Sequence, residues 1–137
     1  MQTFQEVRDY LAEIPNIHRG GCGHSALAMY KWLEKNNELV EDTRIVYLYC
    51  HQTGNYETNS KALEGNGEFV APSHVVLAHK GQHIDAKSDH AYNGWFDEES
   101  HTLNDVQELI TTFGAPNWND NFDRNHVDSI NETLGLN

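Results

Sequence analysis

The stretch Gly20-Gly21-Cys22-Gly23-His24-Ser25-Ala26 decides how the rest of the chain is interpreted. A run of helix formers follows it, and Ala26, Met29 and Leu33 recur on the same helical face as Cys22. This spacing predicts a helix that begins at or near Cys22 and turns an apolar face to the core. A helix N-terminus offers free N–H groups and a positive dipole end, which favour a thiolate. Cys22 is therefore a candidate nucleophile; the alternative is a small buried residue at a glycine-rich turn.

Length and charge restrict the classes of protein that this chain fits. Its 137 residues fit one domain, residues 1–137. A net charge of -12 disfavours binding to nucleic acid or to anionic membranes. The chain has no apolar run long enough to span a bilayer, and its first residues are polar rather than signal-like. The two cysteines do not indicate a disulfide scaffold, so we expect a cytoplasmic protein.

The first half of the chain predicts two helices and a strand. Residues 3–13 read as a helix with a Thr3 and Glu6 capping box, stopped by Pro15. Residues 44–50 are rich in β-branched and aromatic types and read as a strand that ends at Cys50, which we take as structural. Residues 51–68 are turn formers. They predict a long loop, either a flap over a site or an excursion without a role.

The second half predicts a hairpin and C-terminal helices. Apolar runs at 73–79 and 82–87 flank Lys80-Gly81, the shape of a β-hairpin. Residues 89–97 read as a loop, residues 103–113 as a helix, and residues 127–134 as a weaker helix. The expected fold is α+β. The cysteine helix packs on a small antiparallel sheet made from residues 44–50, 73–79 and 82–87, with helices at the C-terminus.

The hairpin brings a histidine and a carboxylate into reach of each other. A two-residue loop pairs Ala78 with His83 and Val76 with Asp85, which makes His74 the diagonal neighbour of Asp85. A three-residue loop would place them on opposite faces. The arrangement predicts a base and its orienting group, with Cys22 sulfur within about 4 Å of a His74 nitrogen. A strand-end histidine and a turn-proximal carboxylate without chemistry are the structural alternative.

These motifs resemble the papain-like cysteine hydrolases. Gly-Gly-Cys-Gly-His-Ser-Ala opens a helix, a strand begins His-Val, and a hairpin ends Ile-Asp-Ala, which is similar to the small bacterial and phage enzymes of the NlpC/P60 type. The resemblance implies a papain-like fold with Cys22 as nucleophile, His74 as base and Asp85 as orienting residue. It implies hydrolysis or acyl transfer on a peptide or a small amide, isopeptide or ester, without a cofactor. Papain-like enzymes stabilise the oxyanion with a glutamine before the cysteine; the matching position here is Asn16, with His18 as competitor.

Two further readings stay open. A non-catalytic acidic binding or inhibitor protein on a papain-like shell is favoured by the net charge of -12 and by the shorter amide at Asn16. A Cys/His metal site would have to use His18, Cys22 and His24, because His79 and His83 sit on a strand and turn where a spacing of four does not converge. We expect no metal. The sequence does not indicate the substrate or the oligomeric state.

Overall fold

The computed structural model of the chain describes residues 3–17, 21–50, 74–86, 89–90, 96–102, 104, 123 and 125–136. Side chains at 47–50, 74, 89–90, 96–99 and 101 lie outside this description. Three helices and five strands are present in these ranges: α1 (Phe4–Ala12), α2 (Cys22–Lys35), β1 (Arg44–Cys50), β2 (His74–His79), β3 (Gln82–Ile84), β4 (Asp89–His90), β5 (Phe96–His101) and α6 (His126–Leu134). The expected α+β class is confirmed.

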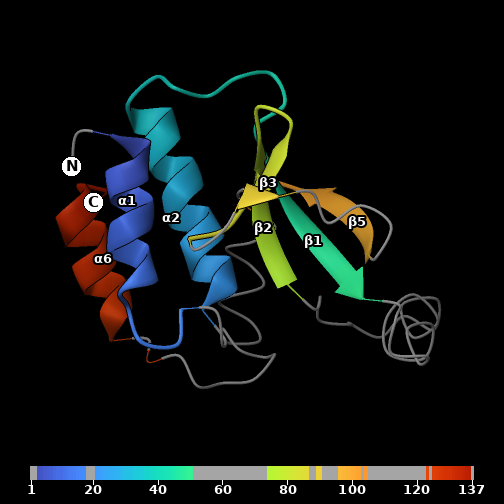
Figure 1. Cartoon of the computed structure of the whole chain (residues 1–137). Helices are drawn as coiled ribbons and strands as arrows, with labels where there is room; N and C mark the ends of the chain where they lie inside the picture. Colours follow the sequence, from blue (N-terminus) through green and yellow to red (C-terminus); the bar gives the residue numbers. More distant parts are fainter. Residues whose placement is uncertain are drawn as a thin grey trace.

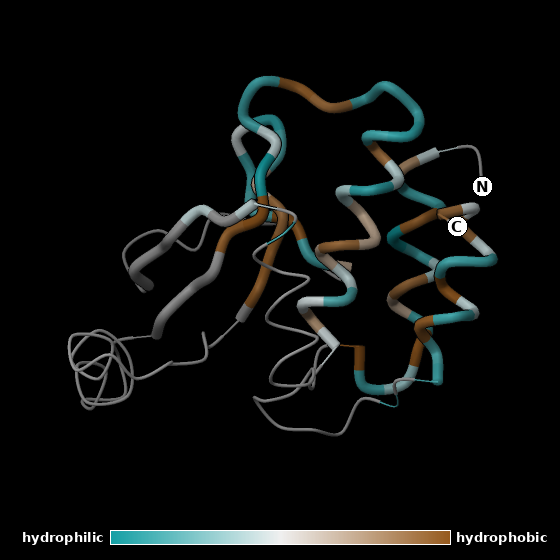
Figure 2. The backbone as a smooth tube through the Cα atoms, turned by 180° about the vertical axis from the view of Figure 1, so that it is seen from behind, coloured by the Kyte–Doolittle hydropathy of each residue, from teal (hydrophilic) through white to brown (hydrophobic). Residues whose placement is uncertain are grey.

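Helix α2 occupies the middle of the molecule. It packs on β1 and β2 on one side and on α1 and α6 on the other (Figure 1). Apolar residues of the helices and strands line this junction, as the brown segments of the backbone show in Figure 2. The shared core includes Val7, Leu11, Ala26, Met29, Leu33, Ile45, Val75, Leu77, Ile130 and Leu134. Among the helices described, none is both long and apolar enough to cross a membrane.

Local sequence signals set the boundaries of the first two helices. Thr3 Oγ1 accepts from the Glu6 N–H at 3.1 Å and Glu6 Oε1 accepts from the Thr3 N–H at 3.0 Å, so the predicted capping box is confirmed. Helix α2 begins at Cys22 as predicted. Asn37 follows its end in the left-handed region at φ 58°, a conformation that asparagine tolerates well.

The predicted hairpin is confirmed with its two-residue loop. Ala78 pairs with His83, and Lys80 and Gly81 have φ values of 53° and 80°, as a type I′ turn requires. The sheet is antiparallel in every pair and has the strand order β4-β3-β2-β1-β5. Its two faces are buried separately. Val75 and Leu77 join the core shared with α2, whereas Val76 and Ala78 form a second cluster with Val46.

Two expectations differ from the structure, and two fall outside the described residues. The second hairpin strand ends at Ile84 rather than at position 87. The predicted loop at 89–97 is wrong at both ends, because residues 89–90 form β4 and residues 96–101 form β5 against β1. The sequence Phe-Asp-Glu-Glu-Ser-His has little strand propensity, and the ladder to β1 forms the strand instead. The predicted loop at 51–68 and, apart from position 104, the predicted helix at 103–113 lie outside the described residues.

The turn of the hairpin is held by the segment that follows α2. Asp42 Oδ1 and Oδ2 accept from the N–H groups of Lys80 at 3.0 Å and Gly81 at 2.7 Å. The Gly81 N–H, with a further contribution from that of Lys80, holds the pKa of the Asp42 carboxyl below its ordinary value. Next to this contact, Thr43 Oγ1 lies 2.7 Å from His79 Nδ1. The segment therefore fixes the end of β2 relative to the end of α2.

The turn predicts opposite effects for two neighbouring substitutions. Gly81→Ala should lower the free energy of unfolding by about 1 kcal/mol, because a Cβ is strained at positive φ. No atom of the described residues lies within 4 Å of that Cβ, so strain alone acts. Lys80→Asn should raise the free energy of unfolding by about 0.5 kcal/mol, since asparagine is favoured at this turn position. Urea unfolding measures both, and a neutral Gly81→Ala would contradict the turn assignment.

The surroundings of His79 predict that the free energy of unfolding falls as the pH drops below neutrality. Burial, with a smaller contribution from the Lys80 ammonium, lowers the pKa of His79 below its ordinary 6.5, against the opposing carboxylates of Asp42 and Glu38. The unfolded chain therefore binds the proton more readily, and the stabilisation by neutral His79 is complete above pH 6.5 and is lost as the pH falls below it. Urea unfolding at pH 7.5 and 5.5 measures how much unfolding free energy the protein loses between the two pH values. His79→Gln should lose less than wild type, and the control His126→Gln should lose as much as wild type. Equal losses in wild type and His79→Gln would refute the assignment.

Candidate functional site

Cys22 is the first residue of α2, and the N-terminus of this helix has no side-chain cap. Gly21 is the N-cap residue, with φ -102° and ψ 1°, and it makes no side-chain capping hydrogen bond. The first helical hydrogen bond runs from the Ser25 N–H to the Gly21 carbonyl at 2.9 Å. By helix geometry, the N–H groups of Cys22 and Gly23 precede the intrahelical ladder. The thiol therefore lies beside N–H donors at the positive end of the helix dipole.

The first turn of α2 is buried. Cys22 is 4% exposed, His24 7% and Ser25 2%. Ser25 Oγ makes no hydrogen bond to any atom of the described residues, although helical serines often bond the carbonyl one turn earlier. A reagent has to enter this enclosed turn to reach the sulfur, whereas an exposed thiol would react without such entry.

Helix α2 and strand β2 place Cys22 and the backbone of His74 at the same end of the molecule. The ring of Phe4 stacks on Trp32 with centroids 6.2 Å apart and meets His79 edge-on at 5.8 Å. Trp32 of α2 and His79 of β2 therefore lie at a similar height along the two elements. Cys22 lies ten helical residues before Trp32, about 15 Å. His74 lies five strand residues before His79, about 17 Å. Both elements run in the same direction, and their N-terminal ends point to the same side (Figure 1).

Strand alternation constrains how His74 could meet Cys22. The α2 side of β2 holds Val75 and Leu77, and the other side holds Val76 and Ala78. Position 74 belongs by alternation to the second set. A contact with Cys22 would therefore have to form past the end of β2 and not across the sheet face. The His74 side chain lies outside the described residues, so the predicted distance to the Cys22 sulfur stays a prediction.

Asp85 lies directly beyond β3 and is buried, with 6% of its surface exposed. Its carbonyl oxygen accepts a hydrogen bond from Arg8 Nε at 3.2 Å. Arg8 itself is only 8% exposed, and it was missed in the sequence. Its spacing offered a signal, since Arg8 falls four residues after Phe4 and three before Leu11, within the apolar stripe of α1.

Asn16 lies in the turn after α1, where its conformation provides a structural reason for the residue type. It is exposed, has a φ of 60°, and is the third residue of the turn that the Ile17 N–H closes on the Ile14 carbonyl at 3.2 Å. Asparagine is one of the few residues that adopt this conformation readily. The oxyanion role of Asn16 stays a prediction, and its competitor His18 lies outside the described residues.

The described residues contain no group of three or more His, Cys, Asp or Glu side chains that could hold a metal ion. His79 and His83 have different surroundings. His79 contacts Phe4 and Thr43, whereas His83 is the strand partner of Ala78. The alternative metal site at His18, Cys22 and His24 includes one residue outside the described ranges.

Two asparagines at positive φ allow the oxyanion role of Asn16 to be separated from its turn role. Asn16→Gly keeps the backbone conformation and removes the amide. If the amide stabilises an oxyanion, acylation of Cys22 by an activated ester should slow about 100-fold or more, while alkylation by iodoacetamide, which forms no oxyanion, should not change. Asn37→Gly, at a φ of 58°, is the matched control. Unchanged acylation in Asn16→Gly would leave Asn16 with the turn role alone.

Comparison with known proteins provides no assignment for the site. No family model matches the chain, and neither the curated proteins nor the solved structures give a match. The resemblance to papain-like hydrolases therefore stays a prediction from the residues around Cys22, His74 and Asp85.

Proposed function

We propose that this protein is a thiol-dependent hydrolase or acyltransferase of the papain-like type, acting on an amide, isopeptide or ester bond. The observation that carries the proposal is the position of Cys22. It opens an uncapped central helix, and that helix packs on a strand whose first residue is His74. Papain-like enzymes combine a cysteine at the start of a helix with a histidine on the adjacent sheet, and the order of elements here agrees with that arrangement.

The proposed chemistry uses Cys22 as nucleophile. The thiolate attacks the carbonyl carbon, a C–S bond forms, and the carbonyl oxygen becomes an oxyanion next to the N–H groups at the start of α2. His74, protonated in the ion pair, gives its proton to the leaving amine or alcohol as the scissile bond breaks. His74 then takes a proton from water, or from an acceptor alcohol or amine, which attacks the thioester. The thiolate leaves and the product is released.

Asp85 has the orienting role in this proposal. The carboxylate accepts from the second ring nitrogen of His74 and favours the imidazolium form. The confirmed pairing of Ala78 with His83 supports it, because Asp85 directly follows the last pair of that register, Leu77 with Ile84. Extended by one residue, the register would set Asp85 opposite Val76 and make position 74 its diagonal neighbour, at about 7–8 Å between Cα atoms. Asp85 is buried, as an orienting carboxylate in a protected site would be.

A non-catalytic binding protein on the same shell is the alternative. The 4% exposure of Cys22 favours it, because a nucleophile has to be reached by its substrate. The net charge of -12 is compatible with a basic partner. The two functions differ in the reactivity that they require of Cys22, since a structural thiol has no need to be ionised near neutral pH.

Reactivity of Cys22 at low pH tests the proposal. At pH 6 an ordinary thiol is almost wholly protonated, so a thiolate paired with His74 should react with iodoacetamide at least about 10-fold faster than Cys50 in the same chain. His74→Ala should remove this advantage, because the positive partner is gone. Asp85→Asn should reduce turnover of an ester probe more than it changes thermal unfolding. Labelling is resolved by site with mass spectrometry.

The control for His74→Ala is His126→Ala, on α6, which should leave Cys22 labelling unchanged. Equal rates for Cys22 and Cys50 that do not depend on His74 would rule out the thiolate pair and leave Cys22 as a structural residue. A fast Cys22 in a protein that turns over no amide or ester probe would favour the binding alternative.

A further inference from the structure

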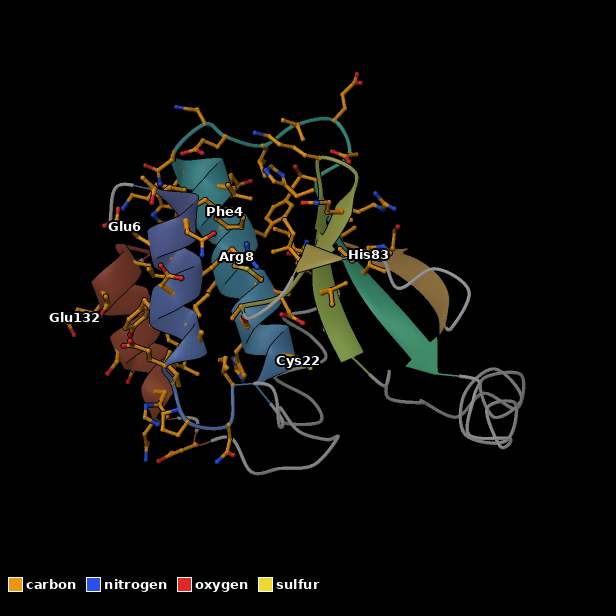
Figure 3. The ribbon with its side chains drawn as sticks, viewed as in Figure 1. Phe4, Glu6, Arg8, Cys22, His83 and Glu132 are labelled. Atoms are coloured by element: carbon orange, nitrogen blue, oxygen red, sulfur yellow. The ribbon has the colours of Figure 1, made fainter. Side chains whose placement is uncertain are left out.

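The chain buries an arginine from α1 against the segment that carries Asp85. Arg8 lies in the middle of α1, 77 residues before Asp85 in sequence, and its Nε donates to the Asp85 carbonyl oxygen at 3.2 Å. Arginine is rarely this buried unless it is paired, yet Arg8 is 8% exposed. In Figure 3, Arg8 lies on α1 level with the end of β3. The motifs around Cys22 and the hairpin do not include α1.

We infer that Arg8 is a positioning residue for Asp85. It holds the backbone where the chain leaves β3 and thereby fixes where the Asp85 carboxylate stands relative to His74. The inference rests on the proposed function, since it gives Arg8 a role only through the orienting role of Asp85.

The end of β3 explains why such a contact is needed. The register between β2 and β3 runs from His79–Gln82 to Leu77–Ile84 and stops there. Asp85 is therefore past the last strand pair, and its carbonyl oxygen bonds to the Arg8 side chain. Asp85 and Ala86 nevertheless remain buried, at 6% and 5% exposure. A buried segment that has left the ladder has its position set by such side-chain contacts, because the strand no longer defines it.

The guanidinium of Arg8 is held at a second point. Its Nη1 donates to Gln5 Oε1 at 3.4 Å, one turn earlier in α1, and Gln5 Nε2 donates to Asp9 Oδ1 at 2.8 Å. The planar fork of arginine makes both contacts at once, whereas a lysine ammonium is a point charge on a flexible stem. Arg8→Lys therefore keeps the positive charge and removes the fixed geometry, which makes it the informative substitution.

A double-mutant cycle on Cys22 labelling separates positioning from plain stabilisation. The rate with iodoacetamide is measured from pH 5 to 8 in the full chain for wild type, Arg8→Lys, Asp85→Asn and the double variant. Arg8→Lys alone should slow labelling at pH 6 about threefold to tenfold, an effect at the lower end of the coupling found between residues in contact. In the Asp85→Asn background the same substitution should have no further effect, because the residue through which it acts is already disabled. The control is Arg44→Lys, whose Nε bonds Ser100 Oγ at 2.9 Å, and its rate should equal that of wild type.

The outcomes distinguish the two proposals. Two results would overturn the positioning role and leave the triad intact. In one, Arg8→Lys slows labelling equally with and without the Asp85 carboxylate; in the other, it does not slow labelling at all. An Asp85→Asn variant with the wild-type pH profile would instead overturn the orienting role of Asp85, and the role of Arg8 with it. The contact is also measured in the unmodified protein, by the NMR coupling across the hydrogen bond from Arg8 Nε to the Asp85 carbonyl carbon. The coupling is expected, and its absence would overturn the inference without any variant having to fold.

Discussion

The burial of α2 on both sides is the constraint on which the rest of the structure depends. Ala26, Met29 and Leu33 have no exposed surface, and Trp32 has 2%. Successive residues of a helix point about 100° apart, so a shift by one residue would put Tyr30 in place of Met29 and Glu34 in place of Leu33 in a close-packed core. A helix with only one buried face could slide or rotate at lower cost. The packing therefore fixes the height and rotation of Cys22 at the end of α2.

The two ends of α2 differ in their hydrogen bonds. At the C-terminal end, the Glu38 N–H bonds the Leu33 carbonyl at 2.8 Å, Asn36 Nδ2 bonds the Trp32 carbonyl at 2.8 Å, and Lys35 Nζ reaches the Gly135 carbonyl. At the N-terminal end, the N-cap residue is Gly21, which is less stabilising than serine, threonine or aspartate by roughly a few tenths of a kcal/mol. In the described residues, the Trp32 and Leu33 carbonyls at one end of α2 thus accept hydrogen bonds, whereas the N-cap residue at the other end has no side chain that could accept one.

The elements that could be predicted from sequence are those with local causes. The Thr3 and Glu6 capping box and the Lys80-Gly81 turn depend on residues within a few positions of each other, and both formed as expected. Strand β5 has a non-local cause, because its acidic sequence becomes a strand only by pairing with β1, about fifty residues earlier. The register of the hairpin could also be predicted, because it depends on the residues of the Lys80-Gly81 turn. The sequence did not reveal which face of the hairpin α2 would cover, and this decides that position 74 belongs by alternation to the face away from α2.

The candidate site is built from element ends, and this has a physical reason. Cys22 begins α2, position 74 begins β2, and Asp85 follows the last residue of β3. Within a helix or strand the backbone groups are already bonded and the side-chain directions are set by the repeat. At an end, N–H groups stay available and the chain can turn toward a neighbouring element. The same freedom leaves an end poorly positioned unless another element holds it. For Cys22 the packing of α2 provides that support. For Asp85, which follows the last strand pair of β3, we infer that the support comes from α1, through the Arg8 side chain that lies within the apolar stripe of that helix.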